Sequence, residues 1–199
     1  MCLLLETIQI RNGEPMHTEY HHWRFNTSRK ECFGLSDEIS LVDLIRVPHD
    51  MQQGILRCRI VYGPEDISIE YVPYHFREIR SLKLVNAGDT DYRLKYADRS
   101  RLKELFEQRG TCDDIIMVKD GLLTDSFAAN LVFFDGHRWY TPDTPLLAGT
   151  QRARLLDSGD ITEARITTEN FREFHKVGLI NAFCDLENMP VTLSDKIVW

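Results

Sequence analysis

The chain has 199 residues, a formal net charge of −7 and an apolar share of 43%. This length allows either one domain or two small lobes around a cleft, and the ordinary composition predicts a chain that folds throughout. Basic residues are scattered singly, which argues against nucleic acid as a partner. The apolar start runs at once into Glu6 and has no basic flank, so we expect a buried strand and no membrane segment.

Five widely spaced cysteines form neither a CxxC pair nor a zinc-ribbon pattern. This odd number favours reduced thiols in a cytoplasmic protein. We expect them to be small residues of the core. They are Cys2, Cys32, Cys58, Cys112 and Cys184.

The N-terminal half is predicted to alternate strands and helices. Asn12-Gly13 is a strong signal for a hairpin turn, Thr18 is suited to cap a helix and Gly34 to end it, and Pro48 stops the next helix. In chain order we expect a strand over 3–10, a helix over 18–32, a second helix over 36–47 and strands over 55–62, 67–74 and 77–85.

A short polar segment with a glycine, Asn86 to Asp91, resembles a lobe boundary. We therefore predict an N-terminal lobe over 1–87 and a C-terminal lobe over 88–199. Thr124-Asp125 alone suggests a turn between two strands. In the second lobe we expect helices over 100–109, 151–158 and 169–175 and strands over 115–118, 130–134, 137–140, 161–167, 177–183 and 196–199.

Three pieces of the sequence carry chemistry. A lysine that forms a Schiff base must be neutral part of the time; Lys95, which has arginines close in sequence, is one candidate and Lys83 is another, although most lysines are solvated. Asp125 could face the pyridine nitrogen of pyridoxal phosphate (PLP). Gly149-Thr150 at a helix start, with a cation such as Arg24, could bind the phosphate of PLP, or could be a simple N-cap.

Taken in order, these pieces resemble the class IV, or fold-type IV, PLP-dependent enzymes. This family includes branched-chain aminotransferase, D-amino-acid aminotransferase and 4-amino-4-deoxychorismate lyase. Its patterns are His-x-x-Arg-apolar, Lys-x-x-x-Arg, Thr-Glu-x-x-x-x-Asn-apolar, Thr-Pro and Leu-x-Gly. The segments that match them are His21–Phe25, Lys95–Arg99, Thr124–Leu131, Thr141–Pro142 and Leu147–Gly149. The resemblance also selects Lys95 over Lys83, which lacks the following arginine.

The resemblance implies an α+β fold of two lobes, like that of D-amino-acid aminotransferase, with an N-terminal α/β lobe and a C-terminal β-barrel-like lobe. It makes Lys95 the catalytic Schiff-base lysine, PLP the cofactor and a homodimer the assembly, with the active site between the lobes. The implied cofactor-binding residues are Arg24, Lys95, Asp125, Ser126, Gly149, Thr150 and Gln151. The implied substrate-binding residues are Tyr62, Arg99, Asn181 and Ala182.

The sequence departs from the family pattern in four places. The acid is usually glutamate, and Asp125 is one methylene shorter. The usual Gly-x-Thr-Arg becomes Gly-Thr-Gln-Arg over 149–152, which displaces the hydroxyl by one residue. Other members have a further strand pair before the segment that starts at Leu4. Some also have a substrate-contacting tyrosine at the position of Leu5.

Asn181-Ala182 and the Lys-x-x-x-Arg pattern resemble the lyases more than the aminotransferases. The predicted reaction is conversion of 4-amino-4-deoxychorismate, a small amino substrate, to 4-aminobenzoate and pyruvate in the folate pathway, with Lys95 as general base and then acid. A class IV aminotransferase acting on branched-chain or D-amino acids is an alternative. A PLP-fold binding protein without catalysis is a further one.

Two other patterns have competing explanations. His17 and His21 could face one side of a helix as metal ligands do, but no acidic or cysteine partner follows at ligand spacing, so we predict no metal site. Arg57 and Arg59 share one face of a strand. A solvated face and a site for a substrate carboxylate both stay open.

Overall fold

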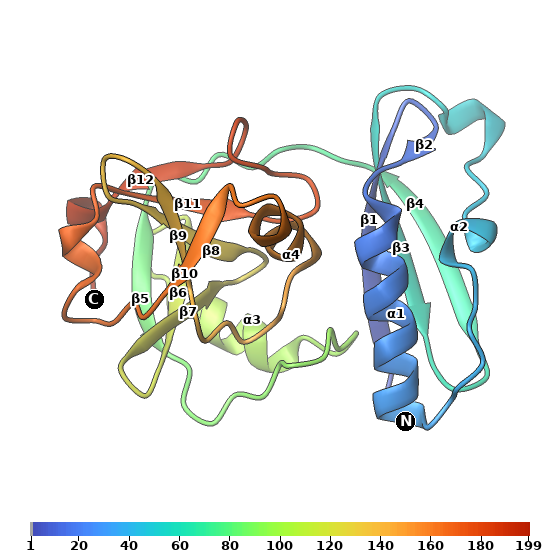
Figure 1. Cartoon of the computed structure of the whole chain (residues 1–199), viewed down its shortest axis with the longest axis horizontal. Helices are drawn as coiled ribbons and strands as arrows, with labels where there is room; N and C mark the ends of the chain where they lie inside the picture. Colours follow the sequence, from blue (N-terminus) through green and yellow to red (C-terminus); the bar gives the residue numbers. More distant parts are fainter. Residues whose placement is uncertain (1) are drawn as a thin grey trace. The chain divides into compact units, whose positions relative to one another are not determined.

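The computed structural model describes residues 2–199, and the first part of the chain is built on a four-stranded antiparallel sheet (Figure 1). Alternate residues of its strand over 55–62 are buried, and they form an apolar core with residues of the first strand and with Phe25 on helix α1. The sheet has the order β2-β1-β3-β4. The elements are β1 (Leu4–Arg11), β2 (Glu14–Pro15), α1 (Thr18–Phe33), β3 (Ile55–Tyr62) and β4 (Ile67–Pro73).

The predicted limits of α1 are nearly correct, but its predicted N-cap is wrong. The helix begins at Thr18, and the cap position is occupied by His17, which has a left-handed backbone (φ 51°) and makes no side-chain cap bond. At the other end Gly34 (φ 71°) donates its N–H to the carbonyl of Lys30 at 3.0 Å. Glycine adopts this conformation without the steric cost that a Cβ imposes. The prediction of Gly34 as the helix end is therefore confirmed.

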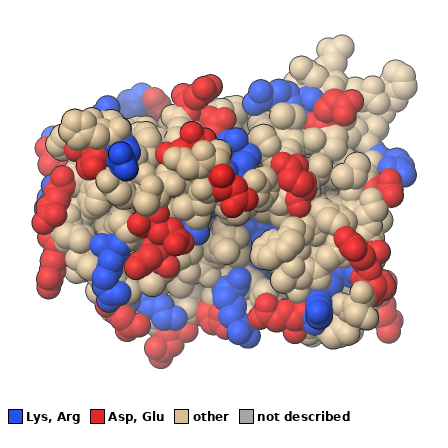
Figure 2. Space-filling view, viewed as in Figure 1, with Lys and Arg blue, Asp and Glu red and all other residues tan. Residues whose placement is uncertain are grey.

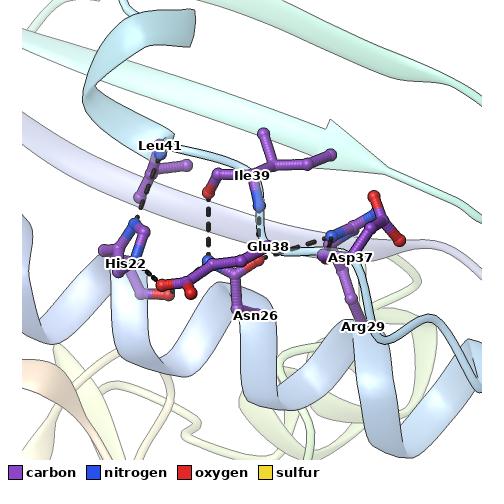
Figure 3. A network of polar contacts seen from close by, with 7 residues as sticks. All are labelled: His22, Asn26, Arg29, Asp37, Glu38, Ile39 and Leu41. Atoms are coloured by element: carbon purple, nitrogen blue, oxygen red, sulfur yellow. Dashed lines mark hydrogen bonds and ion pairs between the residues drawn. The ribbon is translucent and has the colours of Figure 1, made fainter.

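The predicted second helix, over 36–47, is mostly wrong. Only α2 (Leu41–Leu44) and a short 3₁₀ turn, η1 (His49–Met51), form in this region. Figure 3 shows the reason, because side chains of α1 bind the backbone of the segment that precedes α2. The Asn26 amide donates to the carbonyl of Ile39 and accepts its N–H, both at 3.0 Å, and Arg29 donates to the carbonyl of Asp37 at 2.6 Å. These bonds replace those that a helix would make.

The rest of the chain forms a curled sheet with two short helices (Figure 1). Its strand order is β10-β9-β8-β7-β6-β5, and β11 pairs with both β8 and β12. The helices are α3 (Ser100–Glu107) and α4 (Thr150–Asp157). The strands are β5 (Leu82–Asn86), β6 (Asp114–Lys119), β7 (Leu122–Ser126), β8 (Asn130–Phe134), β9 (Trp139–Pro142), β10 (Ile161–Ala164), β11 (Lys176–Ile180) and β12 (Val191–Leu193).

Two elements predicted near the C-terminus are different in the structure. The expected helix over 169–175 is only a 3₁₀ turn, η2 (Phe171–Glu173). The expected strand over 196–199 is replaced by a 3₁₀ turn, η3 (Ser194–Lys196), and a single bridge between Val198 and Lys83. The predicted mixture of α and β structure is confirmed.

By packing, the chain divides into two units whose limits differ from the predicted lobes. The first contains residues up to Phe76 together with Leu94–Asp98, and the second contains Arg77–Arg93 and Arg99–Trp199. Residues 77–87 belong to the second unit because β5 pairs in parallel with β6. Lys95 was expected in the C-terminal lobe, but its segment packs with the first unit.

The surface and the cysteines can be compared with the composition. On the face shown in Figure 2, basic and acidic side chains are interspersed, and the basic ones do not gather into one area. Cys58 and Cys184 are buried as expected, whereas Cys2 is exposed. No helix within residues 2–199 is long and apolar enough to cross a membrane.

Candidate functional site

Asp125 is a buried acid in strand β7, where the sequence alone suggested a turn. One carboxylate oxygen accepts a hydrogen bond from the side chain of Asn130 at 2.7 Å, and the other accepts the backbone N–H of Leu147 at 2.9 Å. Burial raises the pKa of Asp125 to about 6, against the opposing effect of these two hydrogen bonds. The carboxyl group can therefore change its protonation state near neutral pH.

Asn130 connects this acid to the loop that precedes helix α4. Its amide nitrogen also donates to the carbonyl of Leu147 at 2.8 Å. A Cβ added to Gly149 would lie 1.9 Å from the Asn130 side-chain oxygen, so only glycine fits at that position. Asn130 was part of the motif, but its bridging role could not be expected from the sequence.

The start of helix α4 is suited to bind an anion. Gly149 occupies the N-cap position, and Thr150 and Gln151, in the first turn, are both buried. The Gln151 side-chain oxygen accepts from Arg154 at 3.3 Å, which orients the amide, while its nitrogen is buried and has no hydrogen-bond partner. Backbone N–H groups and the helix dipole favour a negative charge at such a position. The buried amide nitrogen adds one more donor.

Arg152, in the same turn, makes hydrogen bonds to other residues of the second unit. It donates to the carbonyl of Pro142 at 3.0 Å and pairs with Glu163 at 2.6 Å. These contacts hold the first turn of α4 against the end of β9 and against β10.

Arg99 holds the turn between β7 and β8. It donates to the carbonyl of Phe127 at 2.5 Å, and its guanidinium lies 4.2 Å from the centre of the Phe127 ring. The N–H of Phe127 donates to Asp114 at 3.2 Å, and within the same turn Ser126 donates to the carbonyl of Ala129. These contacts give Arg99 a position beside the Asp125 motif, where it supports the turn; its substrate contact stays a prediction.

Asn181 also binds the turn between β7 and β8. It follows β11, and its amide nitrogen donates to the carbonyl of Ala128 at 3.3 Å. Its side-chain oxygen accepts the N–H groups of Phe183 at 2.8 Å and Cys184 at 3.2 Å. Ala182, between them, is half-buried. Asn181 and Ala182, the predicted substrate-binding pair, are thus close to the Asp125 motif, and Asn181 binds the turn between β7 and β8.

Lys95 lies in a short segment that pairs with the first residues of β1. Its carbonyl accepts the N–H of Leu5 at 2.8 Å, and Ala97 donates to the carbonyl of Leu3 at 2.8 Å. The residue between them, Tyr96, bridges to Leu4. This pairing fixes the backbone on both sides of the half-buried lysine.

A buried polar cluster lies on β1 and α1 in the same unit. Glu6 accepts two hydrogen bonds from Arg24 at 2.7 Å and one from His21 at 2.7 Å. Burial alone would raise the pKa of Glu6, but Arg24 and His21 outweigh it and lower this pKa to about 2. Burial lowers the pKa of His21, and the nearby cations of Arg24 and Lys95 contribute to that shift. The sequence singled out Arg24 but not Glu6.

The location of Tyr62 does not support the substrate contact predicted for it. Its side chain is 1% exposed and belongs to the apolar core of the first unit. Its ring centre lies 4.5 Å from that of Phe25. Tyr62 is on the face of β3 that α1 covers, because side chains alternate between the two faces of a strand.

The remaining candidates are placed as follows. Arg59 faces Glu70 across the strand pair at 3.4 Å, which favours the explanation as a polar sheet face. His21 binds Glu6, and no group of three potential metal ligands occurs within residues 2–199. Lys83 is in β5 of the second unit. The structure thus gathers Asp125 with the α4 start in one unit, and Lys95 with Arg24 in the other.

Comparisons with known sequences agree with these motifs. The sequence profile of the class IV amino-transferase family matches residues 70–192. An uncharacterised protein of Haemophilus influenzae is 42% identical over 184 residues, which cover 92% of this chain and 98% of that protein.

Solved structures show the same fold. A proposed 4-amino-4-deoxychorismate lyase from Haemophilus somnus has a TM-score of 0.85 and 34% identity, with 92% of this chain and 96% of that chain covered. A proposed amino-acid aminotransferase from Mesorhizobium loti has a TM-score of 0.83 and 20% identity, with both chains fully covered (100%). A hypothetical aminotransferase from Mycobacterium tuberculosis in its PLP-bound form has a TM-score of 0.76 and 16% identity, with 96% and 80% covered. The predicted fold class is confirmed.

Proposed function

Because the chain belongs to the class IV aminotransferase family of PLP-dependent enzymes, we propose that it binds PLP and converts 4-amino-4-deoxychorismate to 4-aminobenzoate and pyruvate. The observation that supports the cofactor is the linkage of the buried acid Asp125, through Asn130, to the carbonyl of Leu147 in the loop that precedes α4. The choice of lyase is supported by the 34% identity to a proposed lyase and by Asn181-Ala182.

The residues present fit PLP on two structural grounds. The Cβ position of Gly149 is occupied by the Asn130 side-chain oxygen, so glycine at this position lets Asn130 connect the buried acid Asp125 to the start of α4. The buried amide nitrogen of Gln151 has no partner, and a phosphate oxygen would satisfy it. Thr150 and Gln151 would bind the phosphate, and Arg24 would add a cation to it.

Asp125 and Lys95 would have different roles toward the bound cofactor. Bound PLP supplies an electron sink for the bonds that break at the substrate. Asp125, once ionised, would accept a hydrogen bond from the protonated pyridine nitrogen. Lys95 Nζ would hold the cofactor before substrate arrives, then take a proton from the substrate and return one as pyruvate leaves.

For a class IV aminotransferase, the alternative, the same residues would hold the cofactor, and Lys95 Nζ would take the Cα proton of the amino-acid substrate. Branched-chain and D-amino acids are the substrate classes to test. A protein that binds PLP without catalysis is the outcome left if both activities are absent. We also propose a homodimer, which light scattering of the purified protein tests.

Absorbance tests the cofactor first. Wild-type protein supplied with PLP should turn yellow, and Lys95→Ala should not, whereas Lys83→Ala, a control lysine outside the motif, should stay yellow. Colourless wild-type protein that takes up no PLP would overturn the enzyme proposal.

Product analysis then separates the reactions. Release of 4-aminobenzoate and pyruvate from 4-amino-4-deoxychorismate supports the lyase. Amino-group exchange within a panel of amino acids and keto acids, without 4-aminobenzoate release, supports the aminotransferase instead.

A further inference from the structure

Glu6 is a carboxylate buried in an apolar core, and its position has no explanation in the sequence motifs. It lies on the face of β1 that also carries Leu4 and Ile8, and it is 0% exposed. A buried charge of this kind costs free energy unless it is paired and fully hydrogen-bonded. The surroundings of Glu6 are not purely apolar, because the buried side chains of Arg24 and His21 contact its carboxylate.

The three hydrogen bonds of Glu6 all go to helix α1. Arg24 donates from Nε to one oxygen and from Nη2 to the other, both at 2.7 Å. His21 donates from Nδ1 to the second oxygen at 2.7 Å. His21 and Arg24 are three residues apart, so both project from one face of α1 toward β1. The carboxylate is thereby fixed from two directions.

The pairing also fixes the plane of the arginine. A guanidinium has five N–H donors in a rigid planar fork, and Glu6 engages two of them side-on. A fork held at two points by an immobile carboxylate cannot rotate about its last bonds, so its outer edge keeps one direction. Such orientation is valuable for binding a phosphate, because less side-chain entropy is lost on binding.

We propose that Glu6 is the positioning residue of Arg24: its carboxylate, braced by His21, sets the direction in which the guanidinium meets the phosphate of the cofactor. This inference rests on the proposed PLP binding. Glu6 itself touches neither the cofactor nor the substrate and acts only through Arg24.

The test compares PLP with pyridoxal, which lacks the phosphate. Dissociation constants of both are measured by fluorescence quenching on the full-length apo-protein, for wild type and for Glu6→Gln. Gln keeps the size of the side chain but replaces one acceptor oxygen by a donor that opposes Arg24 or His21. We expect PLP affinity to fall about tenfold, the equivalent of one charged hydrogen bond, and pyridoxal affinity to change less than about twofold.

Two further variants keep the test decisive. Glu38→Gln makes the same chemical change at an exposed glutamate that pairs with His22 of the same helix, and it should leave both affinities unchanged. Glu6→Asp retains the charge but withdraws the carboxylate by one methylene. If Glu6→Gln does not fold, Glu6→Asp gives the readout and should show the same selective loss.

The outcomes are distinguishable. A selective loss for PLP supports the positioning role. Equal losses for PLP and pyridoxal show that Glu6 only stabilises the fold and overturn the inference, as does an unchanged PLP affinity. Wild-type protein that binds neither compound overturns the proposed function and this inference together. Wild-type protein that binds PLP, with no selective loss of PLP affinity in the folded Glu6 variant, overturns this inference alone.

Discussion

The close approach of Asn130 and Gly149 predicts that substitutions at these two positions have coupled effects on stability. Asn130→Ala leaves a carboxylate oxygen of Asp125 and the carbonyl of Leu147 without this partner, which should cost about 2–4 kcal/mol of unfolding free energy. Gly149→Ala should also destabilise, because its Cβ would meet the Asn130 oxygen at 1.9 Å. In the double variant that clash is gone, so we expect a coupling of at least about 1 kcal/mol in urea unfolding.

The alternative to this coupling is additivity. Gly149 has an ordinary φ of −71°, so backbone strain does not explain a cost for alanine there. If Gly149→Ala destabilises equally in the wild-type and Asn130→Ala backgrounds, the steric explanation is wrong.

The raised pKa of Asp125 predicts that the unfolding free energy of the cofactor-free protein depends on pH. Burial raises the pKa of Asp125 to about 6 from the ordinary value of 3.8, so the folded state holds this proton more tightly than the unfolded state. The protonated Asp125 carboxyl therefore contributes at most about 3 kcal/mol to the unfolding free energy. This contribution is fully present below about pH 4 and is lost as the pH rises through about 6.

Asp125→Asn is the matched control, because an amide does not ionise. Urea unfolding at pH 4.5 and 7.5, conditions chosen about the two pKa values, should show wild type losing stability relative to Asp125→Asn as pH rises. A constant difference between the two proteins would contradict the raised pKa.

At the residue scale, the sequence located some groups and not others. The order of Arg24, Lys95, Asp125 and Gly149 was visible because each has a chemical identity and a spacing. Glu6 was not, because a glutamate near the start of a strand is ordinarily solvated, and only the fold shows that α1 covers it. The substrate contact predicted for Tyr62 has no support from its location, because strand alternation turns its side chain into the core.

At the element scale, Asn26 decides the conformation of the segment before α2. Asn26→Ala removes both bonds to Ile39, and we expect it to lower the unfolding free energy by about 1–3 kcal/mol. Asn26→Asp keeps the acceptor for the Ile39 N–H and should cost less. Thermal unfolding compares these with Thr27→Ala, a change at an exposed neighbour on α1 that should have little effect.

This network also explains why the second helix was predicted too long. The capping residues and the apolar spacing of Ile39 and Val42 favoured a helix, and they are local signals. The backbone groups of Ile39 instead bond to a residue of α1, thirteen positions away. If Asn26→Ala has no effect on stability, another contact must hold this segment extended.

At the scale of the whole chain, the strands were easier to predict than their grouping. Both hairpins of the first sheet follow from turn residues and alternation. The polar segment 86–91 resembled a linker, yet β5 before it pairs with β6 after it. The later segment Leu94–Asp98 returns to β1. Pairing between distant strands has no local signal, so the limits of the units could not be predicted.

The chain passes between the two units at residues 76–77, 93–94 and 98–99. The proposed cofactor provides a test at this scale, because the residues expected to bind it are divided between the units. Arg24 and Lys95 belong to the first unit, and Asp125 and Thr150 to the second. A ligand that binds only the folded state stabilises it by about 2.7 kcal/mol at a concentration of 100 times its Kd. If PLP takes groups from both units, hydrogen exchange should slow in α1 and in α4 together.

The matched control is Lys95→Ala, which retains Arg24 and the α4 start but lacks the amine that would hold the cofactor. With saturating PLP, wild type should gain protection in peptides covering Thr18–Phe33 and Thr150–Asp157. Lys95→Ala should gain less in both, since its affinity is lower. Protection confined to one of the two helices in wild type would mean that only one unit binds PLP, and the ligand set drawn from both units would then be wrong.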